Sequence, residues 1–251
     1  MRLLILGGTT EASALARRLA GRRDLEPILS FAGRTRGPVP PPIPFRVGGF
    51  GGVEGLKTFL AEGKIDAVID ATHPFAAQMS ANAAVACGDP GLPLARFTRP
   101  AWRAREDDRW IGVPDMEAAV RALGERPRRV FLTIGGVQLA AFAAAPHHHY
   151  IVRTIDPPAA IVSLPSHRLI LARGPFGIDD EIALMRDEKV QTLVTKNSGG
   201  TATEAKLAAA RTLDIDVVMI ERPATDDTET FDTLDTLDAV LAWIEHHRPA
   251  P

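Results

Sequence analysis

Residues 3–12 read LLILGGTTEA, and this stretch decides the fold of the chain. An apolar run without charge ends at Gly7 and Gly8, and after two threonines the helix-forming run EASALA occupies residues 11–16. The pattern predicts a buried parallel strand, a tight glycine turn and the N-terminus of a helix in succession. Because backbone amides at a helix start point outward and carry partial positive charge, this turn suits a phosphate group.

The residue types of the turn favour a nucleotide as the ligand. Gly7 and Gly8 let the backbone approach an anion closely, and the hydroxyls of Thr9 and Thr10 can add hydrogen bonds. Thr9 stands where the second glycine of the dinucleotide fingerprint GxGxxG would be, and the turn lacks the Gly-Lys-Ser/Thr ending of a P-loop, which disfavours ATP chemistry. The alternative is an α/β protein that begins in this way without binding a nucleotide.

Length, charge and cysteine content narrow the class of protein. A chain of 251 residues is long enough for one large or two small domains, and its apolar and charged fractions are ordinary for a globular protein. The net charge of −2 argues against a nucleic-acid partner, and the single cysteine, Cys87, excludes an internal disulfide and fits a reducing compartment. No apolar run approaches the roughly 20 residues that span a bilayer, and no leader precedes the first strand, so we expect a cytoplasmic protein without a membrane partner.

Strand-like and helix-like patterns alternate along the chain, which predicts an α/β protein with mainly parallel sheets. The expected strands are residues 3–6, 27–31, 67–70, 94–97, 130–133, 150–153, 169–172, 192–195 and 217–220. The expected helices are residues 11–20, 53–62, 75–87, 116–123, 139–144, 179–186, 203–213 and 237–247. A polar, arginine-rich connector near residues 99–112 separates an N-terminal domain of residues 1–98 from a second domain of residues 99–251.

The end of the second expected strand bears on the choice of cofactor. In a dinucleotide-binding fold this position usually carries an Asp or Glu that binds the ribose 2′-hydroxyl. Here residues 30–36 read SFAGRTR, which contains no acid and two arginines, Arg34 and Arg36. A guanidinium can hold a 2′-phosphate through paired hydrogen bonds, so NADPH is favoured over NADH, and the alternative is a solvated loop arginine.

The third expected strand ends in DATHPFA, residues 70–76, and its carboxyl end faces the same crevice as the glycine turn. Thr72 and His73 come directly before Pro74, which suits the first turn of a helix. His73 could bind a cofactor phosphate or a substrate carboxylate, or donate a proton near neutral pH. The alternative is a capping threonine beside an exposed histidine.

A second polar run, TKNSGGT at residues 195–201, also follows an apolar strand and precedes a helix. Lys196 emerges at the carboxyl end of that strand, with Asn197, Ser198 and two glycines beside it. Such a loop could bind an anion or help to close a site between domains, and the alternative is a solvated lysine.

Together, LLILGGTTEA, the Gly-Arg-Thr segment at residues 33–35, DATHPFA and TKNSGG resemble the precorrin-6A reductase family of cobalamin biosynthesis, in order over almost the entire chain. The resemblance implies NADPH-dependent reduction of a ring double bond of the tetrapyrrole precorrin-6A to its dihydro form, precorrin-6B. It also implies two Rossmann-like domains with an active-site cleft between them. The cofactor contacts expected from it are Gly7, Gly8, Thr9, Thr10, Gly33, Arg34, Thr35, Thr72 and His73. The family pattern that we expect is TKDSGG, so Asn197 is a departure.

The implied substrate carries many carboxylate arms, so its site should present cations. The residues expected to bind the substrate are Arg96, Arg99, Lys196, Asn197 and Ser198, and the expected catalytic residues are His73 and Lys196. Further arginines stand in the connector and at strand ends, at Arg103, Arg105, Arg153 and Arg173. No metal is expected, because the only run of ligand-type residues, the histidines of residues 147–149, lacks convincing ligand spacing. The small tetrapyrrole is the expected partner, and the chain is taken to be a monomer.

Three other hypotheses compete with this one. An enzyme of the anaerobic pathway would perform the same reduction on cobalt-precorrin-6A, and the sequence barely separates the two because the metal arrives with the substrate. A sensor protein would bind NADPH without catalysis. A short-chain sugar epimerase or reductase requires a Tyr-x-x-x-Lys pair, and this hypothesis fails because the single tyrosine, Tyr150, has Thr154 four residues on.

Overall fold

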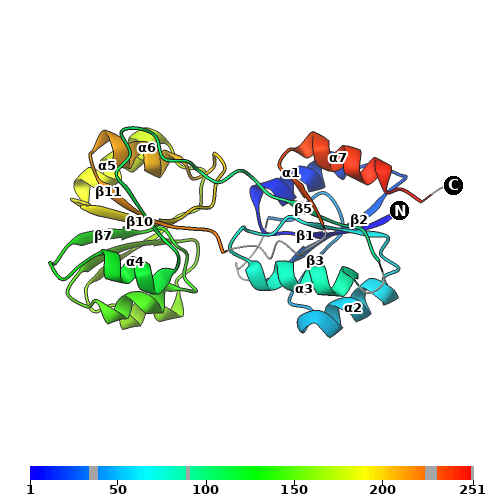
Figure 1. Ribbon diagram of the computed structural model, residues 1–251, viewed down its shortest axis with the longest axis horizontal. Helices are drawn as coiled ribbons and strands as arrows, with labels where there is room; N and C mark the ends of the chain where they lie inside the picture. Colours follow the sequence, from blue (N-terminus) through cyan, green and yellow to red (C-terminus); the bar gives the residue numbers. More distant parts are fainter. Residues whose placement is uncertain (34–38, 89–90, 224–230, 250–251) are drawn as a thin grey trace. The chain divides into compact units, whose positions relative to one another are not determined.

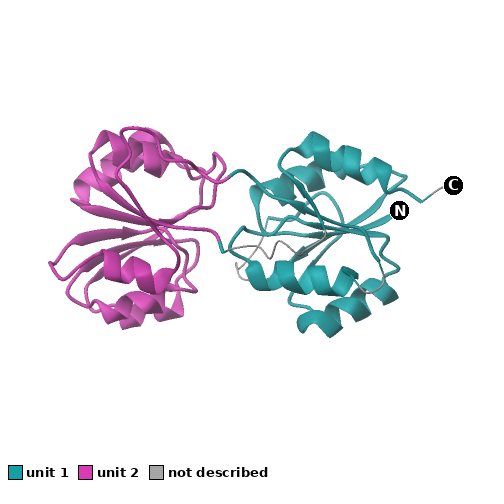
Figure 2. Ribbon diagram, in the orientation of Figure 1, with its two compact units in different colours: residues 1–100, 223–251 teal, residues 101–222 magenta. Residues whose placement is uncertain are grey.

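The computed structural model describes residues 1–33, 39–88, 91–223 and 231–249, and the chain divides into two compact units (Figure 2). Unit 1 comprises Met1–Pro100 and Pro223–Pro251, and unit 2 comprises Ala101–Arg222. This division differs from the expected second domain of residues 99–251, because the C-terminal segment belongs to unit 1.

The C-terminal segment completes the sheet and the core of unit 1. Strand β12 (Asp232–Leu234) pairs with β5 (Leu94–Phe97), and helix α7 (Leu237–His246) packs Val240 and Trp243 into the core beside β1. These contacts join segments that lie far apart in the chain, which explains why a local reading of the sequence assigned the segment to the second domain.

Unit 1 contains a six-stranded sheet in the order β12-β5-β4-β1-β2-β3, and all its strand pairs are parallel. Its other strands are β1 (Arg2–Leu6), β2 (Glu26–Phe31), β3 (Phe45–Val47) and β4 (Ala67–Asp70). From β1 the chain proceeds to β2 and β3 on one side, and from β4 it proceeds to β5 on the other. Ligands of open α/β sheets bind at the carboxyl ends of the strands where the strand order reverses in this way, so β1 and β4 mark the switch point.

Strand β1 is buried on both faces. Leu3 and Ile5 belong to one core cluster, whereas Leu4 and Leu6 belong to another. Helices α1 (Thr10–Leu19) and α7 cover the first face, and α2 (Gly52–Glu62) and α3 (Ala77–Gly88) cover the second (Figure 1). Burial on both faces explains why β1 reads as a continuous apolar run instead of an alternating pattern.

Unit 2 contains a second six-stranded parallel sheet, in the order β6-β11-β10-β7-β8-β9. Its strands are β6 (Trp110–Val113), β7 (Arg129–Leu132), β8 (His149–Thr154), β9 (His167–Leu171), β10 (Thr192–Lys196) and β11 (Asp216–Ile220). Helices α5 (Ile178–Asp187) and α6 (Ala205–Thr212) cover one face, and α4 (Met116–Ala122) lies on the other (Figure 1). Two 3-10 helices complete the unit, η1 (Leu139–Ala144) and η2 (Ala159–Ser163).

The two sheets have the same spatial arrangement of strands, but the strand at one edge comes last in the chain in unit 1 and first in unit 2. The switch point lies between β1 and β4 in unit 1 and between β7 and β10 in unit 2. The edge position beside β5, which β12 fills late in the chain, corresponds to the position beside β11, which β6 fills at the start of unit 2. The loops after β7 and β10 therefore correspond in topology to the glycine turn and to DATHPFA.

All nine expected strands are confirmed, with ends that shift by up to two residues. The structure adds β3, β6 and β12, which the sequence did not predict, and all three lie at sheet edges, where a short strand needs no long apolar run. Helix α3 begins at Ala77 and not at residue 75, because Ala76 N donates to His73 O in a turn that contains Pro74. Residues 139–144 form a 3-10 helix where an α-helix was expected. Within the described ranges, every helix is too short or too polar to cross a membrane.

Candidate active site

The glycine turn follows β1 at the switch point of unit 1. Gly7 N donates to Ser30 O (2.9 Å), and a Cβ at Gly7 would lie only 2.6 Å from Leu29 Cδ1. Gly8 has a φ of 122° and is exposed, with no atom within 4 Å of the position that a Cβ would take. The turn thus presents open backbone at the carboxyl edge of the sheet.

The first turn of α1 holds backbone N–H donors for which the described residues provide no acceptor. Thr9 caps the helix, because its Oγ1 accepts a hydrogen bond from Ala12 N (3.1 Å). In the part of the chain that the structure describes, no acceptor binds the backbone N–H groups of Gly8, Thr9, Thr10 or Glu11. Consecutive amide donors at the N-terminus of a ten-residue helix fit an anion such as a cofactor diphosphate.

The carboxylate in this first turn is compensated by an arginine. Arg99 Nη1 lies 2.5 Å from Glu11 Oε2, and both side chains are largely buried, at 15% and 20% exposure. A bare carboxylate at this position would repel an anion bound to the amides, so the ion pair keeps the helix start suited to phosphate.

Asp70 organises the loop after β4, a role that the sequence reasoning missed. Asp70 is 3% exposed and accepts hydrogen bonds from Thr72 N (3.0 Å), Thr72 Oγ1 (2.6 Å) and Ser80 Oγ (2.5 Å). Arg96 Nε lies 3.7 Å from Asp70 Oδ2. The available signal was an Asp at the end of the apolar run AVID with Thr two residues later, a pattern typical of an Asx turn.

Two of the threonines expected to contact the cofactor donate their hydroxyl hydrogen bonds to other groups of the protein. Thr9 Oγ1 donates to Ala71 O (2.8 Å), which ties the glycine turn to the β4 loop, and Thr72 Oγ1 donates to Asp70. Because a hydroxyl has one hydrogen, these side chains shape the site, and the donors left toward a ligand are backbone amides. The exposed Thr10 donates to Glu11 Oε2 (3.0 Å).

His73 lies half-buried at the same edge of the sheet. Its Nδ1 accepts a hydrogen bond from Phe75 N (3.2 Å), so in the neutral ring Nε2 carries the hydrogen. The loop therefore places an imidazole at the sheet edge that carries the glycine turn, and an imidazole can bind a phosphate or carboxylate oxygen.

The end of β2 is only partly described. Gly33 has a φ of 74°, and Arg34 and Thr35 lie outside the described residues, as does Arg36. The neighbouring Arg46 of β3, which the sequence reasoning missed, donates to Ser30 Oγ (2.8 Å) and to the carbonyls of Gly48 and Gly49, and it lies 4.2 Å from the centre of the Phe50 ring. Arg46 thus holds the glycine-rich loop after β3 against β2.

The TKNSGG loop of unit 2 follows β10 at the second switch point. Lys196 is half-buried at the end of the strand, and Ser198 N donates to Lys196 O (2.7 Å). Gly199 and Gly200 have φ values of 68° and 75°, in the left-handed region that favours glycine. Asn197 is buried, and its side chain contacts other parts of unit 2.

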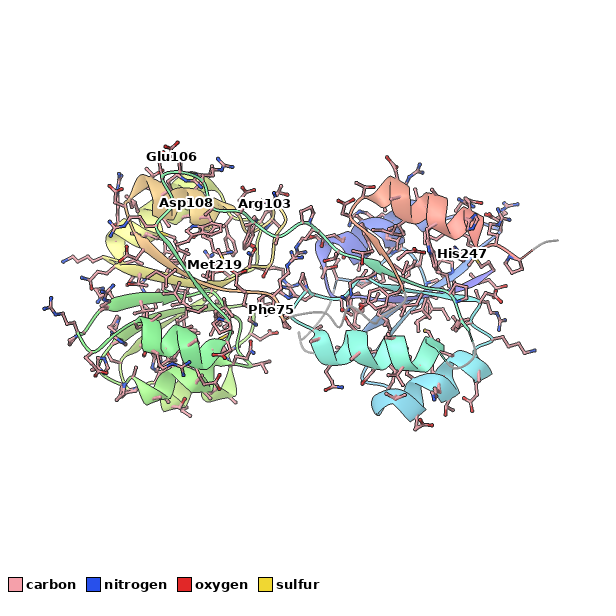
Figure 3. All side chains as sticks on the ribbon, in the orientation of Figure 1. Phe75, Arg103, Glu106, Asp108, Met219 and His247 are labelled. Atoms are coloured by element: carbon pink, nitrogen blue, oxygen red, sulfur yellow. The ribbon has the colours of Figure 1, made fainter. Side chains whose placement is uncertain are left out.

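The arginines expected near the substrate fall into two groups. Arg96 and Arg99 pair with carboxylates of unit 1, and Arg153 is 8% exposed, paired with Glu181 (2.7 Å) and stacked 3.7 Å from the centre of the Phe176 ring. Exposed arginines stand instead at Arg103, which Figure 3 labels, and at Arg105 and Arg173.

A cavity of about 980 Å³ in unit 1 lies away from the switch point. Its lining includes Leu94 and Asp232, the first residues of β5 and β12, together with Trp243 and His247. It therefore opens at the amino ends of these strands, opposite the edge that carries the glycine turn. Among the described residues, no group of three or more potential ligands could hold a metal ion.

The chain matches the family model described as precorrin-6x reductase CbiJ/CobK over residues 2–245. It is 50% identical over 250 residues to the precorrin-6A reductase of Rhodobacter capsulatus, a match that covers 100% of this chain and 98% of the relative. A solved structure of CobK precorrin-6A reductase superposes with a TM-score of 0.93 at 50% identity, covering 100% of this chain and 98% of that chain. A cobalt-precorrin-6A reductase of Synechocystis is 27% identical over 258 residues, which cover 98% of this chain and 97% of the relative. The chain belongs to the precorrin-6x reductase CbiJ/CobK family.

Proposed function

We propose that this chain reduces a ring double bond of precorrin-6A, with NADPH as the hydride donor, in cobalamin biosynthesis. Family membership supports the reaction, and one structural observation supports the cofactor: the unused amide donors at the N-terminus of α1, beside the switch point of unit 1. That arrangement fits the diphosphate of a dinucleotide.

NADPH is proposed over NADH because β2 ends without a carboxylate. Residues 30–33 read SFAG, and the sequence continues with Arg34, Thr35 and Arg36. An acid at this position would bind the ribose 2′-hydroxyl, whereas an arginine suits a 2′-phosphate. We expect NADPH to bind at least about tenfold more tightly than NADH, since a charge-assisted clamp is worth roughly 1.4 kcal/mol or more.

In the proposed mechanism the bound cofactor supplies the hydride, and the chain binds, orients and protonates. The amides of Gly8, Thr9 and Thr10 would hold the diphosphate, and the His73 imidazole would bind a phosphate or a substrate carboxylate. Lys196 anchors a substrate carboxylate, because an ammonium group is a poor proton donor near neutral pH. The proton that accompanies the hydride comes from His73 or from water.

The residues that bind the substrate are also part of the proposal. We assign Lys196 and Ser198 to the carboxylate arms of the substrate and retain Arg96 and Arg99 as candidates, although each of the two arginines already pairs with a carboxylate in unit 1. The cleft between two domains, the monomeric state and the cytoplasmic location likewise stay predictions.

The metal-free substrate is favoured over its cobalt form by the comparisons. Relatives named precorrin-6A reductase are 47–50% identical to this chain, whereas relatives named cobalt-precorrin-6A reductase are 27–30% identical. The test follows NADPH absorbance in separate reactions with precorrin-6A and with cobalt-precorrin-6A. Faster oxidation with precorrin-6A is expected, a preference for the cobalt form would reverse the substrate assignment, and binding without oxidation in both would indicate a sensor.

A further inference from the structure

Asn197 is the first residue after β10, and each of its polar atoms is engaged within unit 2. Side-chain Oδ1 accepts from Trp102 N (2.8 Å), and Nδ2 donates to Trp102 O and to Glu221 Oε2 (3.2 Å each). The backbone N donates to Ile220 O (2.8 Å), and the backbone O accepts from Arg222 Nε (2.9 Å). Asn197 is 5% exposed, so its polar atoms bond to the protein and not to water. Removal of one of these hydrogen bonds would leave a buried polar atom without a partner.

The partners of Asn197 lie at the two places where the chain passes between the units. Unit 2 begins at Ala101 and ends at Arg222. Trp102 is the second residue after the first crossing, and Glu221 and Arg222 are the last two residues before the second. Asn197 therefore forms hydrogen bonds with residues at both the beginning and the end of unit 2.

Residues beside the same two crossings also form hydrogen bonds with other residues of the TKNSGG loop. Trp102 Nε1 donates to Gly200 O (3.0 Å), and Arg222 Nη2 donates to Ser198 O (3.1 Å). The path of the loop from Lys196 to Gly200 is thus set by residues at the entry and exit of the unit.

We propose that Asn197 is a positioning residue, which binds both crossings to the loop that carries Lys196 so that the loop and the crossings move together. The inference rests on the proposed function, which gives Lys196 its role. The proposed positioning role also explains why residue 197 is an asparagine and not an aspartate. Nδ2 faces two acceptors, Trp102 O and Glu221 Oε2, and an aspartate would set an oxygen against both.

The first test removes the side chain and observes a single amide by NMR. In Asn197→Ala the Trp102 backbone amide loses its acceptor, so its hydrogen exchange should accelerate by about tenfold or more. The resonances of residues 196–200 should shift, and kcat/KM for the tetrapyrrole should fall. NADPH affinity, which depends on unit 1, should stay within about twofold. As a matched control, Lys196→Ala shortens a side chain of the same loop and should leave the Trp102 amide as protected as in the unaltered protein.

The second test uses a conservative pair and also serves if the alanine variant fails to fold. Asn197→Asp should lower kcat/KM at neutral pH, because a carboxylate then faces Glu221. Adding Glu221→Gln supplies an N–H donor for the new carboxylate and should restore part of the lost kcat/KM, while Trp102 O still faces an oxygen. Glu221→Gln alone keeps an oxygen acceptor for Asn197 Nδ2 and is expected to have little effect. Such a rescue is not expected of a residue that binds the substrate itself.

The proposal is overturned if Asn197→Ala raises only KM while the Trp102 amide stays protected, which is the result expected of a direct substrate contact. A failure of Glu221→Gln to rescue Asn197→Asp also overturns it. If the unaltered protein reduces no tetrapyrrole, the proposed function fails, whereas the Trp102 exchange rate and the shifts of residues 196–200 still decide whether Asn197 holds the loop.

Discussion

At the residue scale, compensated charge determines how side chains near the site can act. Arg99 neutralises Glu11, Arg96 lies against Asp70, and Arg153 is paired inside unit 2. The sequence shows that cations are present, but it does not show these partners, because Arg99 and Glu11 are separated by 88 positions. Residue types therefore indicated which charged groups are present, whereas the partner of each arginine is evident only from the structure.

The Glu11–Arg99 pair gives a prediction for cofactor binding. In Arg99→Ala the Glu11 carboxylate is left uncompensated beside the amide donors of α1, so NADPH affinity should fall by about fivefold, the size of a charge effect of roughly 1 kcal/mol at a helix terminus. The double variant Arg99→Ala with Glu11→Gln should recover most of the affinity in a fluorescence titration. A double variant as weak as the single one would show that Arg99 contacts the ligand directly.

His148 gives a prediction for stability against pH. Burial, with a contribution from the neighbouring His147, lowers the pKa of the His148 imidazole below its ordinary 6.5, and the side chain is fully buried. The unfolded chain therefore takes up this proton at a higher pH than the folded chain. The contribution of neutral His148 to stability is complete above about pH 6.5 and is lost as the pH falls toward the folded-state pKa.

Urea unfolding at about pH 7.5 and about pH 5.5 measures the effect. His148→Asn keeps an acceptor for Arg128 N, which donates to His148 Nδ1 (3.2 Å), but it does not titrate. The unaltered protein should lose more free energy of unfolding on acidification than the variant does. If acidification lowered the free energy of unfolding equally in the two proteins, the lowered pKa of His148 would not be the source of the pH dependence.

At the element scale, the interior strands were predictable and the edge strands were not. β1, β4 and β10 are buried on both faces and read as apolar runs, whereas β3 and β12 are three residues long and β6 follows a polar connector. The glycine turn was predictable because the close approach of β2 and a left-handed backbone both restrict the residue type. The correspondence of the β7 and β10 loops to those after β1 and β4 was not, since it depends on strand order.

The turn after β1 gives a prediction for packing. In Gly7→Ala the new Cβ would lie 2.6 Å from Leu29 Cδ1 in a fully buried setting, so the free energy of unfolding should fall by about 1–3 kcal/mol. Adding Leu29→Val removes the clashing atom and should restore part of the loss. Gly49→Ala, where the added Cβ meets no atom within 4 Å, should change stability by less than about 0.5 kcal/mol. Equal effects of Gly7→Ala and Gly49→Ala would contradict the packing argument.

At the scale of the whole molecule, one strand order is used twice, and the chain crosses between the units twice. Among the described residues, unit 1 carries backbone amides without an acceptor at its switch point, and unit 2 carries a loop with a lysine at the corresponding edge. The sequence predicted two α/β domains but not the second crossing, because β12 and α7 join unit 1 only through contacts that are remote in sequence.

The most direct test of the central claim follows the hydride itself. NADPH carrying deuterium at the transferred position of the nicotinamide ring is incubated with the protein and precorrin-6A, and the product is analysed by mass spectrometry and NMR. The proposed function predicts one deuterium on a ring carbon of the product, with an equal amount of NADP⁺ formed. A product without deuterium, or NADPH that binds without being oxidised, would contradict the claim that this chain transfers a hydride from NADPH to the tetrapyrrole.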